Sequence, residues 1–475
     1  MNTQCTPEQM EFHAFGRRVV VGQFDGGQIS SDGGAMLLRE ADLRTGILSR
    51  LAQQFTDHRN EGLIEHSVLE LVAQRVLGLT LGYEDLNDHD RLAADSLLAV
   101  LVGKSDPTGQ NRHRKQDQGK PLASSSTLNR LELTLPDANA EERYKKIVAD
   151  SDGMDRLLVD IFLESYRKPP KRIWLDLDAT DDPVHGHQEG RFFHGYYRHY
   201  CYLPLYIFCG DHLLCARLRP SNIDAAAGSV DELQRIVGQI RQRWPKTEIV
   251  IRGDGGFCRD DLMSWCEQQP KVLYLFGLAK NARLKRALGR AMHEAQQQHQ
   301  ETGKPARVFD DFDYRTRKSW SRTRRVVGKA EHLSKGANPR FVVTNLPREE
   351  VDAQTLYERG YCARGDMENR IKEQQLDLFA DRTSTATLLA NQIRLYFSSF
   401  AYVLLCALRR LGLKGTDMER AQCGTIRLKL LKIGARLKIS MRRVCLSFSE
   451  SYPYAVLYQQ ILSNLKTVPL YSAPT

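Results

Sequence analysis

The sequence lacks several patterns that would assign it to a common class of protein. Its ten cysteines include no C-x-x-C pair and no spacing typical of a zinc site. The best candidate for a membrane-spanning helix, residues 395–408, is shorter than the roughly 20 residues such a helix needs. The first residues do not combine a basic start with an apolar run, as a signal peptide would. We therefore expect buried thiols, a cytoplasmic location and a buried core helix over residues 395–408.

Positive charge moderately exceeds negative charge. The 475 residues include 68 Lys and Arg against 58 Asp and Glu, which gives a formal net charge of +10. This balance favours a polyanionic partner such as nucleic acid, although many soluble proteins are mildly basic. The length suggests roughly two to four domains at about 100 to 200 residues each.

Residues 1–168 have mainly helical patterns, and we expect them to form a DNA-binding N-terminal domain. Apolar residues recur at helical spacing over residues 64–77. A polar loop at residues 103–122 precedes a helix whose first residues, 124–127, supply N-caps. This loop and helix either contact DNA or form a solvated linker. The loop cations expected to contact DNA are Arg112, Arg114 and Lys115.

Strand patterns begin after Pro169 and Pro170, which cannot continue a helix. Three strand-like runs come first, and helix, strand, helix and strand patterns follow. The runs lie at residues 173–178, 202–208, 213–219, 230–244, 248–252, 260–268 and 272–277. This order is that of an RNase H-like layer fold. We therefore expect an α/β core with a mixed five-stranded sheet and flanking helices, with its first part over residues 172–280.

Acidic residues lie at the ends of two of these strands. A period of two puts Trp174, Asp176 and Asp178 on one face of the first strand, and Asp178 is nearer its open end. Asp254 directly follows another apolar strand, and its flanking glycines would let a metal or a phosphate approach the backbone. Adjacent strands would allow two such acids to share one cation. Asp176 remains the alternative to Asp178 as the first acid.

A third acidic position lies on an expected helix. Helical spacing puts Tyr361, Arg364, Glu368 and Lys372 along one stripe. One face of this helix would therefore present a carboxylate between two cations. The plain alternatives are a solvated acid, or a surface ion pair that contributes roughly 0.3 to 0.5 kcal/mol.

Together the three elements resemble the DDE transposases of bacterial insertion sequences, in the branch with a Tyr-x2-Arg-x3-Glu-x6-Lys helix. The resemblance lies in residues 178–180, 253–255 and 361–368, and it points to the insertion-sequence group numbered thirteen-eighty. It implies that Asp178, Asp254 and Glu368 are catalytic metal ligands, and that Tyr361 and Arg364 hold a DNA phosphate. Where the family has Lys, seven positions after the Glu, this chain has Gln375, and Lys372 is the alternative source of that charge.

Such a triad suits DNA cleavage and joining. Three carboxylates can hold two Mg²⁺ ions about 3.5 to 4 Å apart, one activating the attacking oxygen and the other stabilising the leaving oxygen. Mn²⁺ is the alternative ion. The expected partners are double-stranded DNA, as terminal inverted repeats and target, and at least one further copy of the chain. A nuclease without strand transfer and a non-catalytic DNA-binding protein are the rival functions.

Residues 281–350 are expected to form a β-rich insertion, followed by the second part of the core at residues 351–410. Its basic β ribbon would suit the DNA backbone, because neutralising phosphates releases counterions. Trp320 would either stack on a frayed base or pack under the ribbon. The ribbon cations expected to contact DNA are Arg322, Arg324 and Arg325.

Two further segments have alternative interpretations. The histidines of the first could hold zinc, but no Cys or carboxylate set completes four ligands, so a loop over the active site is the alternative. They are His185, His187, His194 and His199. Residues 411–475 are expected to form a basic C-terminal α/β tail. Its residues 427–443 would contact DNA, contact a second subunit, or form a solvated basic face.

Overall fold

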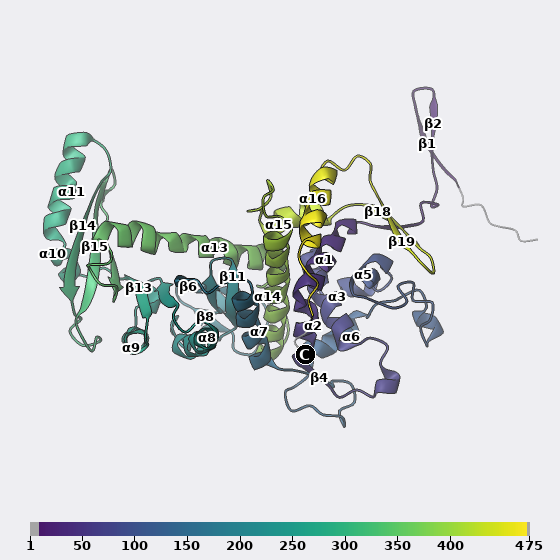
Figure 1. Cartoon of the computed structure of the whole chain (residues 1–475), viewed down its shortest axis with the longest axis horizontal. Helices are drawn as coiled ribbons and strands as arrows, with labels where there is room; N and C mark the ends of the chain where they lie inside the picture. Colours follow the sequence, from purple (N-terminus) through teal and green to yellow (C-terminus); the bar gives the residue numbers. More distant parts are fainter. Residues whose placement is uncertain (1–8, 473–475) are drawn as a thin grey trace, which may run out of the picture. The chain divides into compact units, whose positions relative to one another are not determined.

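The computed structural model describes residues 9–472, which form two compact units (Figure 1). Unit 1 takes the chain up to Val148 and again from Phe400 onward, and unit 2 takes Ala149–Ser399. Contacts thus group the C-terminal tail with the N-terminal helices and place the first boundary about 20 residues before the expected hinge. Helix α14 (Leu388–Leu411) contains the second boundary and covers the expected core helix.

Unit 1 is mainly helical. Helix α3 (Val68–Thr80) begins at a capping box, in which the Ser67 and Glu70 side chains accept each other's backbone N–H, and it is buried from Leu71 to Thr80. The other longer helices are α1 (Met36–Thr45), α2 (Ile47–Ala52), α5 (Ser96–Leu101), α6 (Ser125–Leu133) and α16 (Ala455–Lys466). The basic tail contributes β18 (Ala435–Ile439) and β19 (Val444–Phe448), which pair with β3 (Gln28–Ser30) in one sheet.

Unit 2 is built on a mixed nine-stranded sheet. Its path of neighbours is β11-β10-β6-β12-β13-β17-β15-β14, and β16 pairs with β15. The strands are β6 (Arg172–Ala179), β10 (Leu205–Cys209), β11 (His212–Arg217), β12 (Glu248–Gly253), β13 (Val272–Leu278), β14 (Ala306–Tyr314), β15 (Arg324–Leu333), β16 (Gly336–Ala337) and β17 (Arg340–Thr344). Strands β6, β12 and β13 are parallel, and the other neighbours are antiparallel.

The two faces of this sheet are covered by different helices. Alternate residues of β6 such as Leu175 point into one apolar cluster with α7 (Ser151–Glu164), α8 (Ser229–Arg243) and α9 (Asp260–Gln268). The opposite face packs Trp174 and its neighbours against the helical segment that begins at α12 (Ala353–Thr355). Because side chains alternate along a strand, Asp176 and Asp178 share the face of Trp174.

The strands expected for a separate insertion instead continue the central sheet. Strand β17 pairs with β13, and β15 pairs with β17, so the five expected strands are extended on one side. Residues before them form two helices that the sequence analysis did not expect, α10 (Ala282–Ala287) and α11 (Gly289–Thr302). Helix α11 packs on β14 and β15, which explains why these strands carry apolar residues at alternate positions.

The described cysteines differ in their exposure to solvent. Cys201, Cys209, Cys215, Cys266 and Cys423 are buried, whereas Cys362 and Cys445 are exposed. The expectation of buried thiols therefore fails for these two, and Cys5 lies outside the described residues. Between residues 9 and 472, no helix has the length and apolarity to cross a membrane.

A buried ion network connects α7 to the sheet. Asp155 of α7 is 1% exposed and forms an ion pair with Arg217 of β11. Arg217 also pairs with Glu232 of α8 at 2.9 Å, and the Tyr396 hydroxyl donates to Asp155 at 2.9 Å. Burial raises the pKa of Asp155, although the Arg217 charge opposes that shift. The Asp155 carboxylate thus connects α7 to β11 and α14 directly, and to α8 through Arg217.

Removing this carboxylate should destabilise the chain strongly. We expect Asp155→Ala to lower the free energy of unfolding by about 1 to 3 kcal/mol, because the Arg217 guanidinium and the buried Tyr396 hydroxyl would both lose a hydrogen-bond partner. The adjacent Arg156→Ala removes an exposed ion pair with Asp150 and should cost about 0 to 1 kcal/mol. Urea unfolding of the two variants measures the contrast, and equal losses would contradict the network's role.

Candidate active site

Asp178 and Asp254 lie side by side because of the register between β6 and β12. The parallel pairing places Arg252 opposite Asp176, so the next residues on the same face are Asp254 and Asp178. Asp178 is the second-last residue of β6, and Asp254 follows the last residue of β12. Both carboxylates therefore stand at the same edge of the sheet.

Asp176 is occupied by a buried ion pair. Arg252 donates from Nε and Nη2 to the two Asp176 oxygens, at 2.5 and 2.8 Å. The Arg252 guanidinium also lies 4.7 Å from the centre of the Trp174 ring and donates to the Gly360 carbonyl at 2.6 Å. Asp176 is 6% exposed and does not line the pocket that Asp178 lines. The structure thus gives the two acids of β6 different surroundings.

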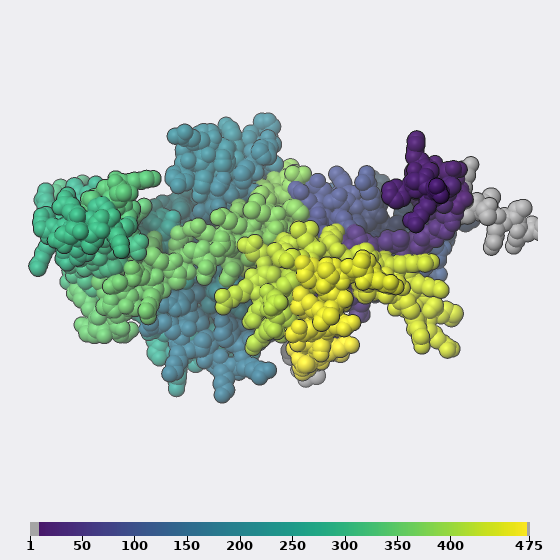
Figure 2. Space-filling view, turned by 90° about the horizontal axis from the view of Figure 1, so that it is seen from above, coloured from purple at the N-terminus to yellow at the C-terminus, as the bar shows by residue number. Residues whose placement is uncertain are grey.

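The third acid comes from one helical segment that crosses the sheet. It runs through α12, a π-helical stretch (Leu356–Tyr361), a 3₁₀ turn (Cys362–Arg364), α13 (Gly365–Lys372) and a second π-helical stretch (Glu373–Asp377). Figure 2 shows this segment, in green, exposed along one face of unit 2. Residues at helical spacing, Arg364, Glu368, Ile371 and Gln375, point into the pocket.

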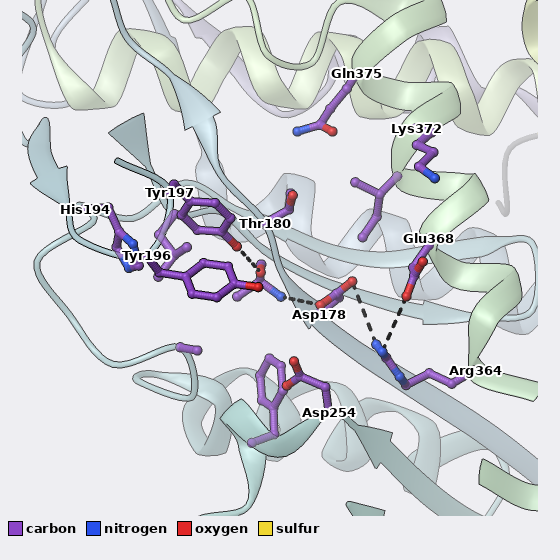
Figure 3. Close-up of a pocket in the computed structure, with 15 residues that line it drawn as sticks. Asp178, Thr180, His194, Tyr196, Tyr197, Asp254, Arg364, Glu368, Lys372 and Gln375 are labelled. Atoms are coloured by element: carbon purple, nitrogen blue, oxygen red, sulfur yellow. Dashed lines mark hydrogen bonds and ion pairs between the residues drawn. The ribbon is translucent and has the colours of Figure 1, made fainter. Parts of the chain in front are cut away.

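The carboxylates meet in a pocket of about 460 Å³ (Figure 3). Arg364 lies between two of them, with Nη1 3.8 Å from Asp178 Oδ2 and Nη2 3.5 Å from Glu368 Oε1. Asp254 is held by its own turn, since its Oδ1 accepts from the Gly256 N–H at 2.8 Å. Polar residues that also line the pocket are Thr180, His194, Tyr196, Tyr197, Lys372 and Gln375.

Close packing around Asp254 requires a glycine on the neighbouring strand. A Cβ at Gly277 of β13 would lie 2.5 Å from the Tyr361 hydroxyl, and 3.0 Å and 3.2 Å from backbone atoms of Gly255 and Asp254. Tyr361 therefore packs with its hydroxyl on Gly277, beside Asp254. Sequence analysis missed Gly277, because its role depends on a contact across the sheet.

The local electrostatics favour a cation. Burial raises the pKa of Asp178 to about 6, the Arg364 charge opposes this shift, and the negative charges of Asp254 and Glu368 add to it. Burial also raises the pKa of Tyr361. Asp178 keeps one short contact to the backbone, as its Oδ1 accepts from the Ala179 N–H at 3.0 Å. A divalent cation would stabilise the ionised form of these carboxylates.

The three carboxylates of the pocket are chemically suited to a metal ion that prefers oxygen ligands. Among the described residues, no three His, Cys, Asp or Glu side chains stand together closely enough to hold a metal as they are. The three acids nevertheless face one pocket and supply carboxylate oxygens, the ligands that Mg²⁺ prefers. The Glu368 side chain is 53% exposed, so it has room to change rotamer. No cysteine lines the pocket, in agreement with a hard cation.

Lys372 and Gln375 both line the pocket beyond Glu368. Lys372 is exposed, one helical turn after Glu368. Gln375 donates from Nε2 to the Asp181 carbonyl at 3.1 Å, which holds the helix against the chain that leaves β6. At the position where the family pattern has a charged Lys, this chain therefore has an uncharged side chain that forms a hydrogen bond.

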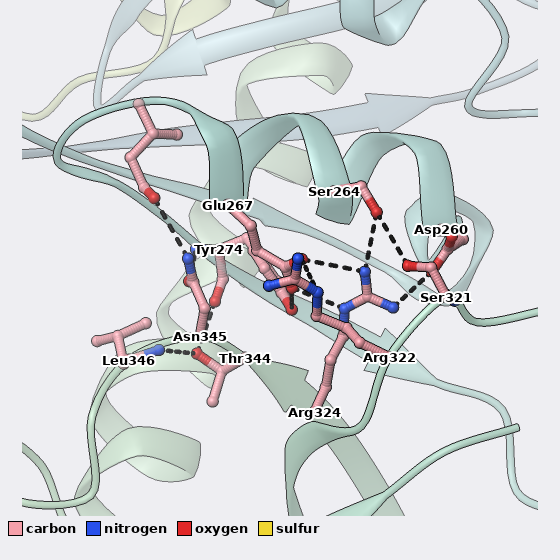
Figure 4. A network of polar contacts seen from close by, with 11 residues as sticks. Asp260, Ser264, Glu267, Tyr274, Ser321, Arg322, Arg324, Thr344, Asn345 and Leu346 are labelled. Atoms are coloured by element: carbon pink, nitrogen blue, oxygen red, sulfur yellow. Dashed lines mark hydrogen bonds and ion pairs between the residues drawn. The ribbon is translucent and has the colours of Figure 1, made fainter.

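Internal acids neutralise part of the basic ribbon. Arg324 is 4% exposed and binds Asp260 at 2.6 Å and Glu267 at 2.7 Å, both on α9 (Figure 4). Trp320 is 5% exposed and packs edge-on against Tyr314, with Arg324 over its ring. Of the two alternatives for Trp320, the structure shows packing under the ribbon and not an available stacking face, because its ring lies in the core.

The other two ribbon cations differ in exposure. Arg325 is buried, binds Asp311 at 2.6 Å and donates to the carbonyls of Leu346 and Val351. Only the Arg322 side chain, 65% exposed and 3.4 Å from Glu267, faces solvent among these predicted contacts. Burial and internal pairing thus remove Arg324 and Arg325 from the expected DNA surface.

The loop cations of unit 1 border a second cavity, of about 740 Å³. Arg112 and Arg114 line it, and Arg112 pairs with Glu65 at 2.9 Å and contacts His66 Nε2 at 2.6 Å. Lys115 is exposed at the start of a short 3₁₀ turn. This cavity belongs to unit 1 alone and carries both signs of charge, since Glu65, Asp90 and Asp117 also line it.

The histidine-rich segment forms a β-hairpin at the pocket. Strands β8 (Phe192–His194) and β9 (His199–Tyr202) pair, and β9 also pairs with β7 (Asp182–Pro183). His194 lines the pocket, and His199 Nε2 lies 2.8 Å from Asp181 Oδ2. Among residues 9–472, these histidines are not part of any group of three or more His, Cys, Asp or Glu side chains that could hold a zinc ion. Sequence analysis missed Tyr196 and Tyr197, although the run of aromatic residues at 192–197 was a signal for them.

The chain is thus a mixed α/β protein whose pocket is lined by three acids, two at strand ends and one on a helix. Residues 12–470 match the sequence model of the family described as transposase DDE domain group 1. Because this match covers nearly the whole chain, the chain belongs to that family of transposases.

No curated protein matches the chain. Among solved structures, the chain is similar to one titled "Cryo-EM structure of piggyBac transposase synaptic complex with hairpin DNA". The sequence identity is 11% and the TM-score is 0.39, over 94% of this chain and 87% of that chain.

The contact at Gly277 gives a prediction that needs no substrate. We expect Gly277→Ala to lower the free energy of unfolding by about 1 to 3 kcal/mol, because the added methyl overpacks the site. Tyr361→Phe removes the nearest atom, so the double variant should recover part of this loss. Denaturant unfolding of the single and double variants measures the coupling. Strict additivity would show that Tyr361 does not pack on Gly277.

The pKa of Asp178 predicts a pH-dependent stability for the metal-free chain. Its folded pKa of about 6 exceeds the ordinary pKa of an aspartate, about 3.9, so the stabilising contribution is present below pH 4 and is lost as the pH rises through 6. Relative to wild type, Asp178→Asn should therefore gain up to about 3 kcal/mol between pH 4 and 7. Unfolding in EDTA at several pH values measures this, and a constant difference would contradict it.

Proposed function

We propose that this chain is a DDE transposase that cleaves DNA at the ends of a mobile element and joins the freed 3′-OH to target DNA. One observation carries the proposal. Asp178, Asp254 and Glu368 come from three separate elements and line a single pocket, in a chain that belongs to a transposase family. Neighbouring carboxylates repel one another when ionised, so a cation bound in this pocket would stabilise their charged forms.

Each acid has a defined part in this reaction. Asp178, Asp254 and Glu368 would hold two Mg²⁺ ions, with Mn²⁺ as the alternative. Bound metal ions would activate the attacking oxygen and stabilise the leaving oxygen of an in-line displacement at phosphorus. The Asp254 turn and the Arg252–Asp176 pair keep the strand ends fixed, so little reorganisation is needed.

Cations beside the triad would position the DNA backbone. Arg364 forms ion pairs with Asp178 and Glu368, and its guanidinium would bind a DNA phosphate at the pocket. Tyr361 and the exposed Lys372 flank it on the same helical segment. Arg322 of unit 2, and Arg112, Arg114 and Lys115 of unit 1, are proposed as further DNA contacts.

The remaining expectations belong to the same proposal. Strands β11, β10, β6, β12 and β13 would form an RNase H-like core, and the helical unit 1 would bind element ends. The substrates would be the terminal inverted repeats and target DNA, held by a dimer or larger assembly. A bacterial insertion sequence in the group numbered thirteen-eighty, expressed in the cytoplasm, is the proposed source.

The triad is tested by isosteric substitutions. Asp178→Asn, Asp254→Asn and Glu368→Gln should each reduce Mg²⁺-dependent cleavage of terminal-repeat DNA by roughly a thousandfold or more, about 4 kcal/mol in activation free energy. DNA binding should stay nearly unchanged in a gel-shift assay. Cleavage is measured with labelled repeats in Mg²⁺ and, as a non-catalytic comparison, in Ca²⁺.

A matched control lies on the same helix. Asp366 is exposed and does not line the pocket, so Asp366→Asn should retain cleavage. Full cleavage by any triad variant would remove that acid from the proposed metal set. Cleavage without any joined product, when target DNA is supplied, would favour the nuclease, and retarded but uncut DNA would favour the binding protein.

A further inference from the structure

An aromatic hairpin stands at the pocket, and the proposed triad does not account for it. Strands β8 and β9 belong to a small three-stranded sheet separate from the nine-stranded one. The pair His194 and His199 closes the hairpin, so residues 195–198 form its tip. The Arg198 N–H donates to the His194 carbonyl at 2.7 Å, which keeps the tip compact.

Large apolar side chains are exposed along this hairpin. Phe193 is 58% exposed, Tyr200 is 47% exposed and Tyr196, at the tip, is 84% exposed. Single exposed aromatics are common, but several on one short element indicate a binding surface. Cations accompany them, since the Arg191 guanidinium lies 4.4 Å from the Tyr200 ring centre and Arg198 is exposed. The surface therefore combines π faces with positive charge.

The tip is fixed next to the carboxylates. The Tyr197 hydroxyl donates to the Ala179 carbonyl at 3.5 Å, and the His194 ring lies 4.9 Å from the Tyr197 ring. Tyr196 packs edge-on against Tyr197, with ring centres 5.0 Å apart. Tyr196, Tyr197 and Asp178 line the same pocket, as Figure 3 shows. Tyr197 thus acts as an anchor, and Tyr196 keeps its ring available.

We infer that the tip of the β8–β9 hairpin is a stacking site for an unpaired nucleobase next to the phosphate on which the carboxylates act. Every base has a π face on which an aromatic ring can stack, but a base inside a duplex is covered by its neighbours. An exposed tyrosine at a phosphate-cleaving pocket therefore suits a base that has left the stack. Arg191 and Arg198 would attract the adjoining phosphates. This inference rests on the proposed function.

A fluorescence experiment without cleavage tests the site. The probe is a short DNA duplex with a single-stranded overhang that contains 2-aminopurine, whose emission is quenched by stacking. It is titrated with the full chain in Ca²⁺. We expect binding to quench the overhang probe, and Tyr196→Ala to remove the quenching and weaken overhang binding roughly tenfold. Tyr196→Phe keeps the ring and should behave like the wild type.

A distant tyrosine and a second substrate supply the controls. Tyr144 is 54% exposed and lies in unit 1, so Tyr144→Ala should leave the quenching intact. With an abasic site in place of 2-aminopurine, wild type and Tyr196→Ala should bind equally, whereas a merely structural defect would weaken both complexes. Unchanged quenching in Tyr196→Ala would overturn the inference. The inference would also be overturned if Tyr196→Ala changed the sedimentation coefficient of the protein but quenched the probe normally. That result would favour contact between copies of the chain.

The stacking site and the proposed transposase function can fail independently of each other. If the wild type cuts terminal repeats in Mg²⁺ but Tyr196→Ala quenches normally, only the stacking site fails. If the wild type quenches the overhang probe but cuts no DNA in Mg²⁺, the transposase proposal fails while a single-strand contact at Tyr196 remains.

Discussion

Parallel pairing between β6 and β12 sets the positions of the two strand-end acids in the pocket. The pairing puts Asp176 opposite Arg252, whose bidentate contacts at 2.5 and 2.8 Å are buried. A slip of one residue would turn these charges toward the apolar cluster around Leu175, where they would lose their partners. The ion pair and the apolar cluster thus specify the same register. Asp178 and Asp254, one step farther along that face, become neighbours as a consequence.

Arg252 also connects this strand pair to the helix that carries Glu368. Its Nη1 donates to the Gly360 carbonyl, which lies in a π-helical stretch with a carbonyl available to a side chain. Tyr361, the next residue, packs on Gly277 of the adjacent strand. The helix is therefore fixed two turns before Glu368, close to the strand ends. One guanidinium links all three elements of the candidate triad, which explains why a basic residue is buried there.

Local patterns were sufficient for the elements that carry the acids, and insufficient for contacts between distant segments. Strand alternation predicted the shared face of Asp176 and Asp178, and the apolar strand predicted the exposed end at Asp254. Local patterns could not predict that Trp320 and Arg324 are buried. The acids that neutralise Arg324 lie on α9, about 60 residues earlier in the chain. Strand partners are equally non-local, so β14, β15 and β17 were expected as a separate insertion and instead extend the sheet.

Net charge is a poor guide to where a polyanion would bind this chain. Several arginines of the basic ribbon neutralise internal acids, whereas Arg364 stands between Asp178 and Glu368 at 3.8 and 3.5 Å. Those distances exceed a normal hydrogen bond, so this guanidinium is held by charge more than by directed contacts. A divalent cation held by the same carboxylates would supply the positive charge that Arg364 supplies to them in this structure. Under the proposed function, the Arg364 guanidinium would then be available to a DNA phosphate, so one side chain would serve both as a counterion of the acids and as a phosphate ligand.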